Sequence, residues 1–365
     1  MNKKYEAFFI LYALGDTIGF NNGKWEAKLL RHYKYDHINE YVSNFISLGG
    51  VNGIELKKWL VSDDTEYLIA TSNALIINKE NKNIDKYVNI LKNEIIKIHN
   101  KLVLEERKGI DRMPDETTVI YTEIFTDDDD AKNVKLNNLT DYNMFAASRS
   151  MSIGLACKKD IQKLIDFSVE SARITHNSII GYLSSIITSY FVSLGIQNIS
   201  VTEWPLLLIK LFESKMVKKY VGDDIDNLSD YILLINMWKL YIDTKLKNKK
   251  SKSFGNLIFR MKYYYDTFID SKLIKDNQTE YLKKQYILQL IIVYDSLLDC
   301  DGCWEKLLFY SIFVYLYNPK STMGAIAGGL YGAVYGFGDV PDKIIKHLEE
   351  KKTLIKLAKN FSSFF

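Results

Sequence analysis

The sequence predicts an all-α protein, and three observations lead to that prediction. Apolar residues recur at helical spacing through most of the chain. Four prolines in 365 residues leave long stretches in which a helix can run without interruption. Convincing runs of alternating polar and apolar residues, which would indicate half-buried strands, are absent from the sequence.

The clearest helix is expected to begin after Ser62. Five positions between Leu68 and Ile76 follow the i, i+1, i+4, i+7, i+8 spacing of a face directed to a core. Ser62 is a suitable N-cap, and Asp63 and Asp64 then lie in the first turn, where the helix dipole favours negative charge. Similar patterns predict helices over 84–101, 145–156, 160–174, 178–194, 228–245, 257–270, 278–299 and 303–317.

Two stretches interrupt this pattern. Residues 107–141, which contain Pro114 and the acidic run Asp127 to Asp130, are expected to form a long irregular excursion, with a short extended segment at Thr117 to Phe125. Residues 244–254 are expected to form a basic loop. Because amphipathic helices resume on both sides without a change of composition, we expect a single domain over 1–365.

Composition limits the classes of function. The net charge of +3 arises from intermixed Lys, Asp and Glu, so we expect no nucleic-acid partner. The longest apolar run that we recognise, Leu307 to Tyr317, is shorter than a membrane span, so we expect no membrane partner. Three cysteines argue against a disulfide-built secreted domain, and we expect a cytoplasmic protein, with a monomer favoured but the oligomeric state left open.

Gly328, Gly332 and Gly336 recur every fourth residue within one predicted helix. In water each such glycine costs roughly 1 kcal/mol relative to alanine. We therefore expect that another helix approaches this row very closely in the core. A membrane dimer motif is the alternative, for which the segment is too short.

Two short acidic segments contain the candidate metal-binding and catalytic residues. Residues 15–26 contain Asp16 and Glu26 among glycines and polar residues, and residues 62–65 read Ser-Asp-Asp-Thr. Carboxylates and hydroxyls at helix edges are the oxygen ligands that a hard cation prefers. The alternative for an isolated Ser-Asp-Asp-Thr is simple helix capping by Ser62 with a solvated first turn. Asp16, flanked by small and apolar residues, is expected to be buried near backbone donors.

His176 lies at the boundary between two predicted helices, within Ser171-Ala-Arg-Ile-Thr-His176. It is a candidate catalytic base. The alternative is a hydrogen-bonded structural histidine. With five histidines in the chain, the spacing supports neither a Ser/His/Asp nor a Cys/His nucleophile arrangement.

Taken in order, these segments resemble the ADP-ribosylglycohydrolase (ADP-ribosylhydrolase) family, most closely its ADP-ribosylarginine hydrolase branch. The matching stretches keep the family's order over nearly the whole chain and are 15–19 with 22–26, 59–65, 146–155, 168–176 with 181–183, 294–295, 304–307 and 325–337. The resemblance implies a compact orthogonal helical bundle. It also implies hydrolysis of an N-glycosidic bond to ADP-ribose, and ADP-ribose or an ADP-ribosylated protein as partner.

The resemblance also implies a site built on a pair of Mg²⁺ ions. It assigns Glu26, Asp63 and Asp64 to catalysis. For the metal it gives Ser62, Asp63, Asp64 and Thr322, and for substrate binding it gives Asp16, Asn22, Arg149, Thr175 and His176.

The second metal motif of the family, G-D-x-D-[ST], is replaced here by Asn318-Pro319-Lys320-Ser321-Thr322. Both expected aspartates are missing, and the Lys320 charge should repel a cation. We therefore expect one Mg²⁺ ion instead of two, or none. The acids at 127–130 are an alternative source of ligands.

Two further departures affect substrate binding. Tyr142 to Phe145 stand where the family has a glycine-rich turn, and the apolar run Tyr286 to Leu290 replaces its substrate loop. We therefore expect hydrolysis that is weak or lost. The alternatives are full family activity, a catalytically inactive pseudoenzyme serving as a binding or interaction module, and a purely structural helical scaffold.

Overall fold

The computed structural model describes residues 3–26, 36–80, 83–127, 142–247, 255–269, 277–314 and 319–365. Within these ranges the protein is all-α, as predicted, and contains no strand. The described elements are α1 (Lys3–Phe20), η1 (Asn21–Gly23), α2 (Asp36–Ser47), α3 (Gly50–Gly53), α4 (Asp63–Ile77), α5 (Ile84–Glu106), α6 (Glu116–Asp127), α7 (Phe145–Ala156), α8 (Ile161–Arg173), α9 (Ile179–Ile196), η4 (Val201–Glu203), α10 (Trp204–Phe212), α11 (Lys215–Val221), α12 (Ile225–Tyr241), η5 (Ile242–Leu246), α13 (Leu257–Phe268), α15 (Gln278–Asp299), α16 (Trp304–Ile312), α17 (Lys320–Tyr335), α18 (Asp342–Ile345) and α19 (Lys351–Phe364).

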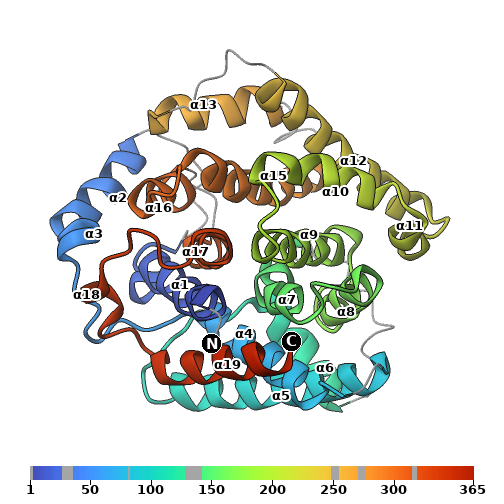
Figure 1. Ribbon diagram of the computed structural model, residues 1–365, viewed down its shortest axis with the longest axis horizontal. Helices are drawn as coiled ribbons and strands as arrows, with labels where there is room; N and C mark the ends of the chain where they lie inside the picture. Colours follow the sequence, from blue (N-terminus) through green and yellow to red (C-terminus); the bar gives the residue numbers. More distant parts are fainter. Residues whose placement is uncertain are drawn as a thin grey trace.

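Helices α1 and α17 lie side by side near the centre of the bundle (Figure 1). A Cβ atom added to Gly324 or Gly328 would lie 2.2 Å from the Gly15 carbonyl oxygen or 2.0 Å from that of Leu11. Gly15 faces Gly324, and Leu11, four residues earlier in α1, faces Gly328, four residues later in α17. The two helices are therefore antiparallel, with their backbones in contact. Side chains at these glycines would force the helices apart, which explains the glycine row.

The expected close approach is confirmed for Gly328 and Gly332, because Gly332 packs against Ala7 in the same way. The prediction was wrong for Gly336. That residue follows the end of α17 with φ of 68°, in the left-handed region that glycine adopts without strain, and no heavy atom lies within 4 Å of its Cβ position. Gly336 therefore ends the helix and does not pack it.

The other helices surround this pair. In Figure 1, α19 and α4 lie on one side, α7 and α9 on another, and α16 and α15 on a third, with α13 outermost. Tight packing of α7 on α9 depends on Gly154, whose added Cβ would lie 2.1 Å from the Ser189 carbonyl oxygen. Buried apolar side chains from α1 to α19 form one continuous core. The starts of α4 and α17 meet at the C-terminal end of α1, where Asp16 accepts the Ser62 N–H and Gly19 packs against Lys320.

Most predicted helices are present, and the one expected over 145–156 matches α7 residue for residue. The extended segment expected at Thr117 to Phe125 was wrong, because those residues lie in α6. The irregular excursion is likewise shorter than expected: α6 occupies its middle, and 128–141 lie outside the described residues. The basic loop was expected to begin at residue 244, but residues 242–246 continue α12 as a π-helix. Residues 248–254 of the expected loop lie outside the described residues.

Among the described residues, helix α9 is the helix that is long and apolar enough for a membrane span, although the sequence had suggested Leu307 to Tyr317 as the longest apolar run. Its mean hydropathy of 1.7 over 18 residues suffices by length and composition for a membrane span, but 94% of it is buried within the bundle. Such burial is typical of a core helix.

A buried ionic network joins the outer helices α12, α13 and α15. The Arg260 guanidinium, which is fully buried, pairs with Asp295 and Asp299. Lys245, carried by the π-helix, lies 2.8 Å from Asp299 and 3.3 Å from Asp295. The Tyr241 and Tyr264 hydroxyls donate to the Asp295 carboxylate at 2.6 and 2.5 Å. Because each buried charge has a partner, this network fixes how α12 and α13 pack on α15.

Candidate active site

The start of α4 forms the centre of the site. Ser62 is the N-cap, and its Oγ accepts a hydrogen bond from the Asp64 backbone N–H at 3.2 Å. The Asp64 carboxylate accepts hydrogen bonds from the hydroxyls of Ser148 in α7, Thr322 in α17 (2.8 Å) and Ser62 (3.4 Å). Capping by Ser62 is thus real, but the first turn is not solvated: Asp63 and Asp64 are each 1% exposed.

Asp16, near the C-terminal end of α1, is hydrogen-bonded to this turn. Its carboxylate accepts the Ser62 backbone N–H at 3.1 Å and the Thr65 hydroxyl. The residue is fully buried. This arrangement confirms the expectation that Asp16 is buried near backbone donors. It gives Asp16 the task of positioning the Ser62-Asp63-Asp64 turn.

Asp115, which is not among the predicted site residues, lies beside Asp63. Its backbone N–H donates to Asp63 Oδ2 at 3.0 Å, and its own carboxylate accepts hydrogen bonds from Thr118 and Asn143 at 2.8 Å. The Asp-x-x-Thr spacing at the start of α6 is an N-capping pattern and was the available signal. Asn143 and Ser148 offered no comparable signal, because only the tertiary fold brings them here.

His176 lies behind Asp115. Its Nε2 atom is 3.4 Å from Asp115 Oδ2, without the alignment of a hydrogen bond, and its Nδ1 lies 2.9 Å from the Thr175 hydroxyl. Burial and then the nearby Arg149 charge hold the His176 pKa well below its usual value. The ring is therefore neutral, and this geometry matches the structural alternative more closely than a solvent-facing base.

Glu26 meets the start of α17. Its Oε1 accepts the Ser321 backbone N–H at 3.0 Å. Lys320, the first residue of α17, is fully buried, and its Nζ lies 4.6 Å from the centre of the Tyr41 ring. Burial raises the Glu26 pKa to about 7, while the Ser321 hydrogen bond and the Lys320 charge oppose that rise. Burial also lowers the Lys320 pKa to about 8.

The acids of the cluster are buried without a positive partner among the described residues, which disfavours their charged forms. Burial, the largest contribution in each case, raises the pKa of Asp16 to about 8 and the pKa of Asp64 to about 6. Burial also raises the pKa values of Asp63 and Asp115. The Asp64 charge adds to the rise for Asp16 and Asp63. Within the described ranges, no Lys or Arg forms an ion pair with Asp16, Asp63 or Asp64. A bound cation would reverse these shifts.

The remaining predicted substrate residues lie at the edges of the cluster or inside the bundle. Asn22 is exposed, and its side-chain amide bonds the Lys58 carbonyl oxygen and the Leu60 N–H at 3.2 and 2.8 Å. Arg149 is buried, and its guanidinium donates to the Ser171 carbonyl oxygen at 2.7 Å. Burial lowers the Arg149 pKa to about 10. The structure therefore brings Asp16, Ser62, Asp63, Asp64 and Thr322 into contact, and substrate contact by the others stays a prediction.

Charged side chains around Arg112 brace the segment before α4. Arg112 donates to the Val61 carbonyl oxygen at 2.7 Å and pairs with Glu105 and Glu349. Glu349 in turn accepts the Val61 N–H at 2.8 Å. Lys101 pairs with Glu66 in the first turn of α4. These contacts hold residues 61–66 in one position.

The donor set fits one hard cation. Two carboxylates and two hydroxyls, from Ser62, Asp63, Asp64 and Thr322, are oxygen ligands of the kind that Mg²⁺ binds. In the part of the chain that the structure describes, no three Asp, Glu, His or Cys side chains are grouped to hold an ion by themselves. The hydroxyls and water would therefore have to complete the ligand set. Asn318, Asp128, Asp129 and Asp130 lie outside the described residues, so the acidic run is not placed.

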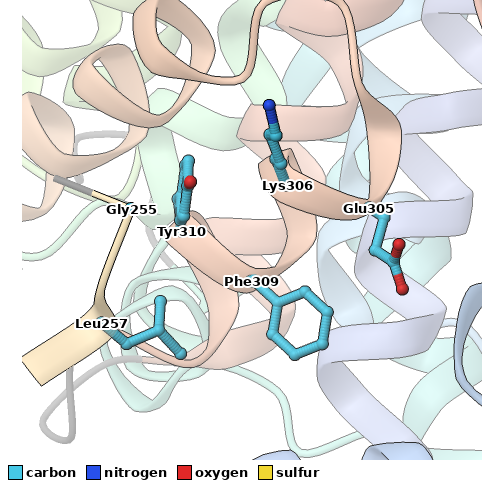
Figure 2. A pocket seen from close by; sticks show the side chains of 6 residues that line it. All are labelled: Gly255, Leu257, Glu305, Lys306, Phe309 and Tyr310. Atoms are coloured by element: carbon cyan, nitrogen blue, oxygen red, sulfur yellow. The ribbon is translucent and has the colours of Figure 1, made fainter. Parts of the chain in front are cut away.

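A separate surface pocket lies between α13 and α16 (Figure 2). Its volume is about 410 Å³, and it is lined by Gly255, Leu257, Glu305, Lys306, Phe309 and Tyr310. None of these is a predicted site residue. The pocket therefore does not belong to the acidic cluster.

Comparisons with known proteins agree with the resemblance. The family model for ADP-ribosylglycohydrolase matches residues 2–247. A protein of Acanthamoeba polyphaga mimivirus, provisionally named ADP-ribosyl glycohydrolase L444, is 28% identical over 348 residues, and the match covers 89% of this chain but 63% of that protein. ADP-ribosylhydrolase ARH1 of Dictyostelium discoideum is 28% identical over 394 residues, covering 97% of this chain and 92% of that protein.

A solved structure described as an ADP-ribosylglycohydrolase-related protein complex has the same fold. It superposes with a TM-score of 0.58 over 99% of this chain and 98% of that chain, at 13% identity. The family match itself spans more than half of the residues. The chain belongs to the ADP-ribosylglycohydrolase family.

Proposed function

We propose that this protein releases ADP-ribose slowly from arginine-linked ADP-ribosylated substrates, with one divalent cation held at the start of α4. The observation that carries the proposal is the Asp64 carboxylate, which is buried beside Asp63 and accepts three hydroxyls from three parts of the chain. Family membership and the name of the Dictyostelium relative support the reaction class.

Each residue of the cluster has a distinct role in the proposed reaction. Asp63 and Asp64, with the Ser62 and Thr322 hydroxyls, would hold the cation. When bound there, a divalent cation supplies polarisation of ribose oxygens and of a water molecule. Asp16 fixes the turn that carries these ligands. Glu26, with a pKa raised to about 7 by burial, is partly protonated at neutral pH, which suits a group that accepts or returns a proton.

Slow turnover follows from the same geometry. Glu26 is held by the Ser321 N–H and by the Lys320 charge, and both stabilise its charged form. A base so stabilised is weaker than a free carboxylate buried without partners.

The proposal is tested with an ADP-ribosylarginine peptide, Mg²⁺ and the purified chain, by measuring free ADP-ribose. We expect release above background that EDTA abolishes. Asp63→Asn and Asp64→Asn should abolish it too, while the exposed Lys356→Met control should not change it. Release that is absent, or equal in wild type and Asp64→Asn, would overturn the hydrolase proposal.

A second candidate is a non-catalytic ADP-ribose-binding protein. It is favoured by the extent to which the acids are already used as structural groups, since Asp64 accepts three hydroxyls and Glu26 caps a helix. Calorimetry with ADP-ribose separates this candidate from a purely structural scaffold. Binding without turnover would support the binding protein, and no binding at millimolar ADP-ribose would leave the scaffold.

A further inference from the structure

The buried lysine at the start of α17 sets how many cations the site can take. Lys320 is fully buried although it begins a helix, where a lysine is not favoured by the helix dipole. Taking an ammonium ion out of water is costly unless a negative charge compensates it. The Glu26 carboxylate, which accepts the N–H of the next residue, Ser321, at 3.0 Å, lies near this ammonium ion, and the two opposite charges stabilise each other.

Glu26 is in turn committed to this end of the cluster. One of its oxygens accepts the Ser321 N–H, and the positive end of α17 points at the same carboxylate. The Tyr41 ring covers the Lys320 ammonium ion at 4.6 Å. A divalent cation on Glu26 would have to bind next to the Lys320 charge and at the positive end of α17, and both repel it.

The other end of the cluster is different. Asp63 lies beside Asp64 and Asp115, and no Lys or Arg side chain in the described ranges is paired with Asp63 or Asp64. Their compensation comes from hydroxyls and backbone N–H groups alone. A bound cation would therefore stabilise the carboxylates of Asp63 and Asp64 more than that of Glu26.

We propose that the Lys320 ammonium ion is a fixed positive charge for Glu26, so that the site binds one divalent cation on Asp63 and Asp64 and excludes a cation from Glu26. This inference rests on the cation site of the proposed function. It assigns Glu26 to Lys320 and α17, and not to the metal.

The test is the number of Mn²⁺ ions bound per full-length chain, from calorimetry and from the electron paramagnetic resonance of free Mn²⁺. Wild type should bind one ion. Lys320→Arg, which keeps the charge, should also bind one, whereas Lys320→Met should bind a second ion. The exposed Lys356→Met serves as the matched control and should bind one.

Glu26→Gln keeps the test decisive if Lys320→Met does not fold. If Glu26 is not a ligand, this variant still binds one ion with an affinity within about threefold of wild type. Loss of the ion in Glu26→Gln would overturn the proposal. So would two ions or none in wild type, or one ion in a folded Lys320→Met.

The ion count is independent of turnover. One ion in wild type together with no release of ADP-ribose would overturn the proposed hydrolase and leave this inference standing. Release of ADP-ribose with two ions bound would overturn this inference and the single cation of the proposed function, and would leave the proposed hydrolysis standing.

Discussion

The Thr322 hydroxyl donates a hydrogen bond to the Asp64 carboxylate at 2.8 Å and so joins the start of α17 to the start of α4, across 258 positions of sequence. Ser148 adds a hydroxyl from the first turn of α7 to the same carboxylate. The N-terminal ends of three helices thus face one acid, and their dipoles favour its negative charge. Stability and cation binding should both depend on these contacts.

Thr322→Val keeps the shape of the side chain and removes its hydroxyl. We expect a loss of about 1–3 kcal/mol in the free energy of unfolding, because a buried carboxylate loses a donor. Mn²⁺ affinity should fall about tenfold, equivalent to about 1.4 kcal/mol. Thermal melts and calorimetry measure the two effects.

Thr71→Val is the matched control for this change. Thr71 is buried, and its hydroxyl donates only to the Tyr67 carbonyl oxygen at 3.0 Å. It should leave Mn²⁺ affinity unchanged. Equal affinities for wild type and Thr322→Val would show that Thr322 is not part of the cation site.

Gly328→Ala tests the contact between α1 and α17. The new Cβ would meet the Leu11 carbonyl oxygen at 2.0 Å, and backbone cannot move aside as a flexible side chain can. We expect a loss of about 3 kcal/mol in the free energy of unfolding, measured by urea denaturation. Gly53→Ala, where no heavy atom lies within 4 Å of the Cβ position, should change it by less than about 0.5 kcal/mol. Similar results for both variants would contradict the close approach.

Arg112→Met tests the brace before α4. Removing the guanidinium leaves Glu105 and Glu349 without their cation and the Val61 carbonyl oxygen without its donor. We expect a loss of about 3 kcal/mol and faster hydrogen exchange at residues 61–64. Lys57→Ala, which breaks the exposed pair with Glu55, should have almost no effect on either measurement. Unchanged exchange at 61–64 would show that the brace does not hold the turn.

Without metal, stability should fall as the pH rises from about 6.5 to 8. Burial raises the pKa of Asp16 to about 8 and of Glu26 to about 7, so the folded state binds more protons in this window than the unfolded state, which has lost them already. His176 and Lys320 oppose the trend in part. Unfolded His176 is half protonated at about pH 6.5 while the folded ring is neutral, and folded Lys320, with its pKa lowered to about 8, begins to lose its proton at the upper end of the window. Neither cancels the combined effect of Asp16 and Glu26. Melting temperatures in EDTA should drop by a few degrees across the window, and less so for Asp16→Asn. A rise with pH would contradict the assigned shifts.

The helices were largely predictable, because patterns such as 145–156 carry a continuous apolar face. Helix α6 was not, since Pro114 and the acids around it resemble a loop and its stability comes from packing on α5. The Ser62-Asp63-Asp64 turn was predictable as a cap. Asp115, Asn143 and Ser148 were not joined to it, because their contacts span 28 to 84 positions and depend on how helices pack. The pairing of Lys245 with Asp299 likewise needed the π-helix.

The glycine contacts between α1 and α17 have a consequence for how this site can diverge. The two backbones touch at four successive levels, the fourth where Gly19 meets the Lys320 carbonyl oxygen, so neither helix can slide against the other without a clash. The backbone of residues 319–322 is therefore held in a fixed position relative to Asp16, whatever side chains these residues carry. Single codon changes there can exchange a metal ligand for a proline or a serine, or the reverse, while the architecture is inherited intact.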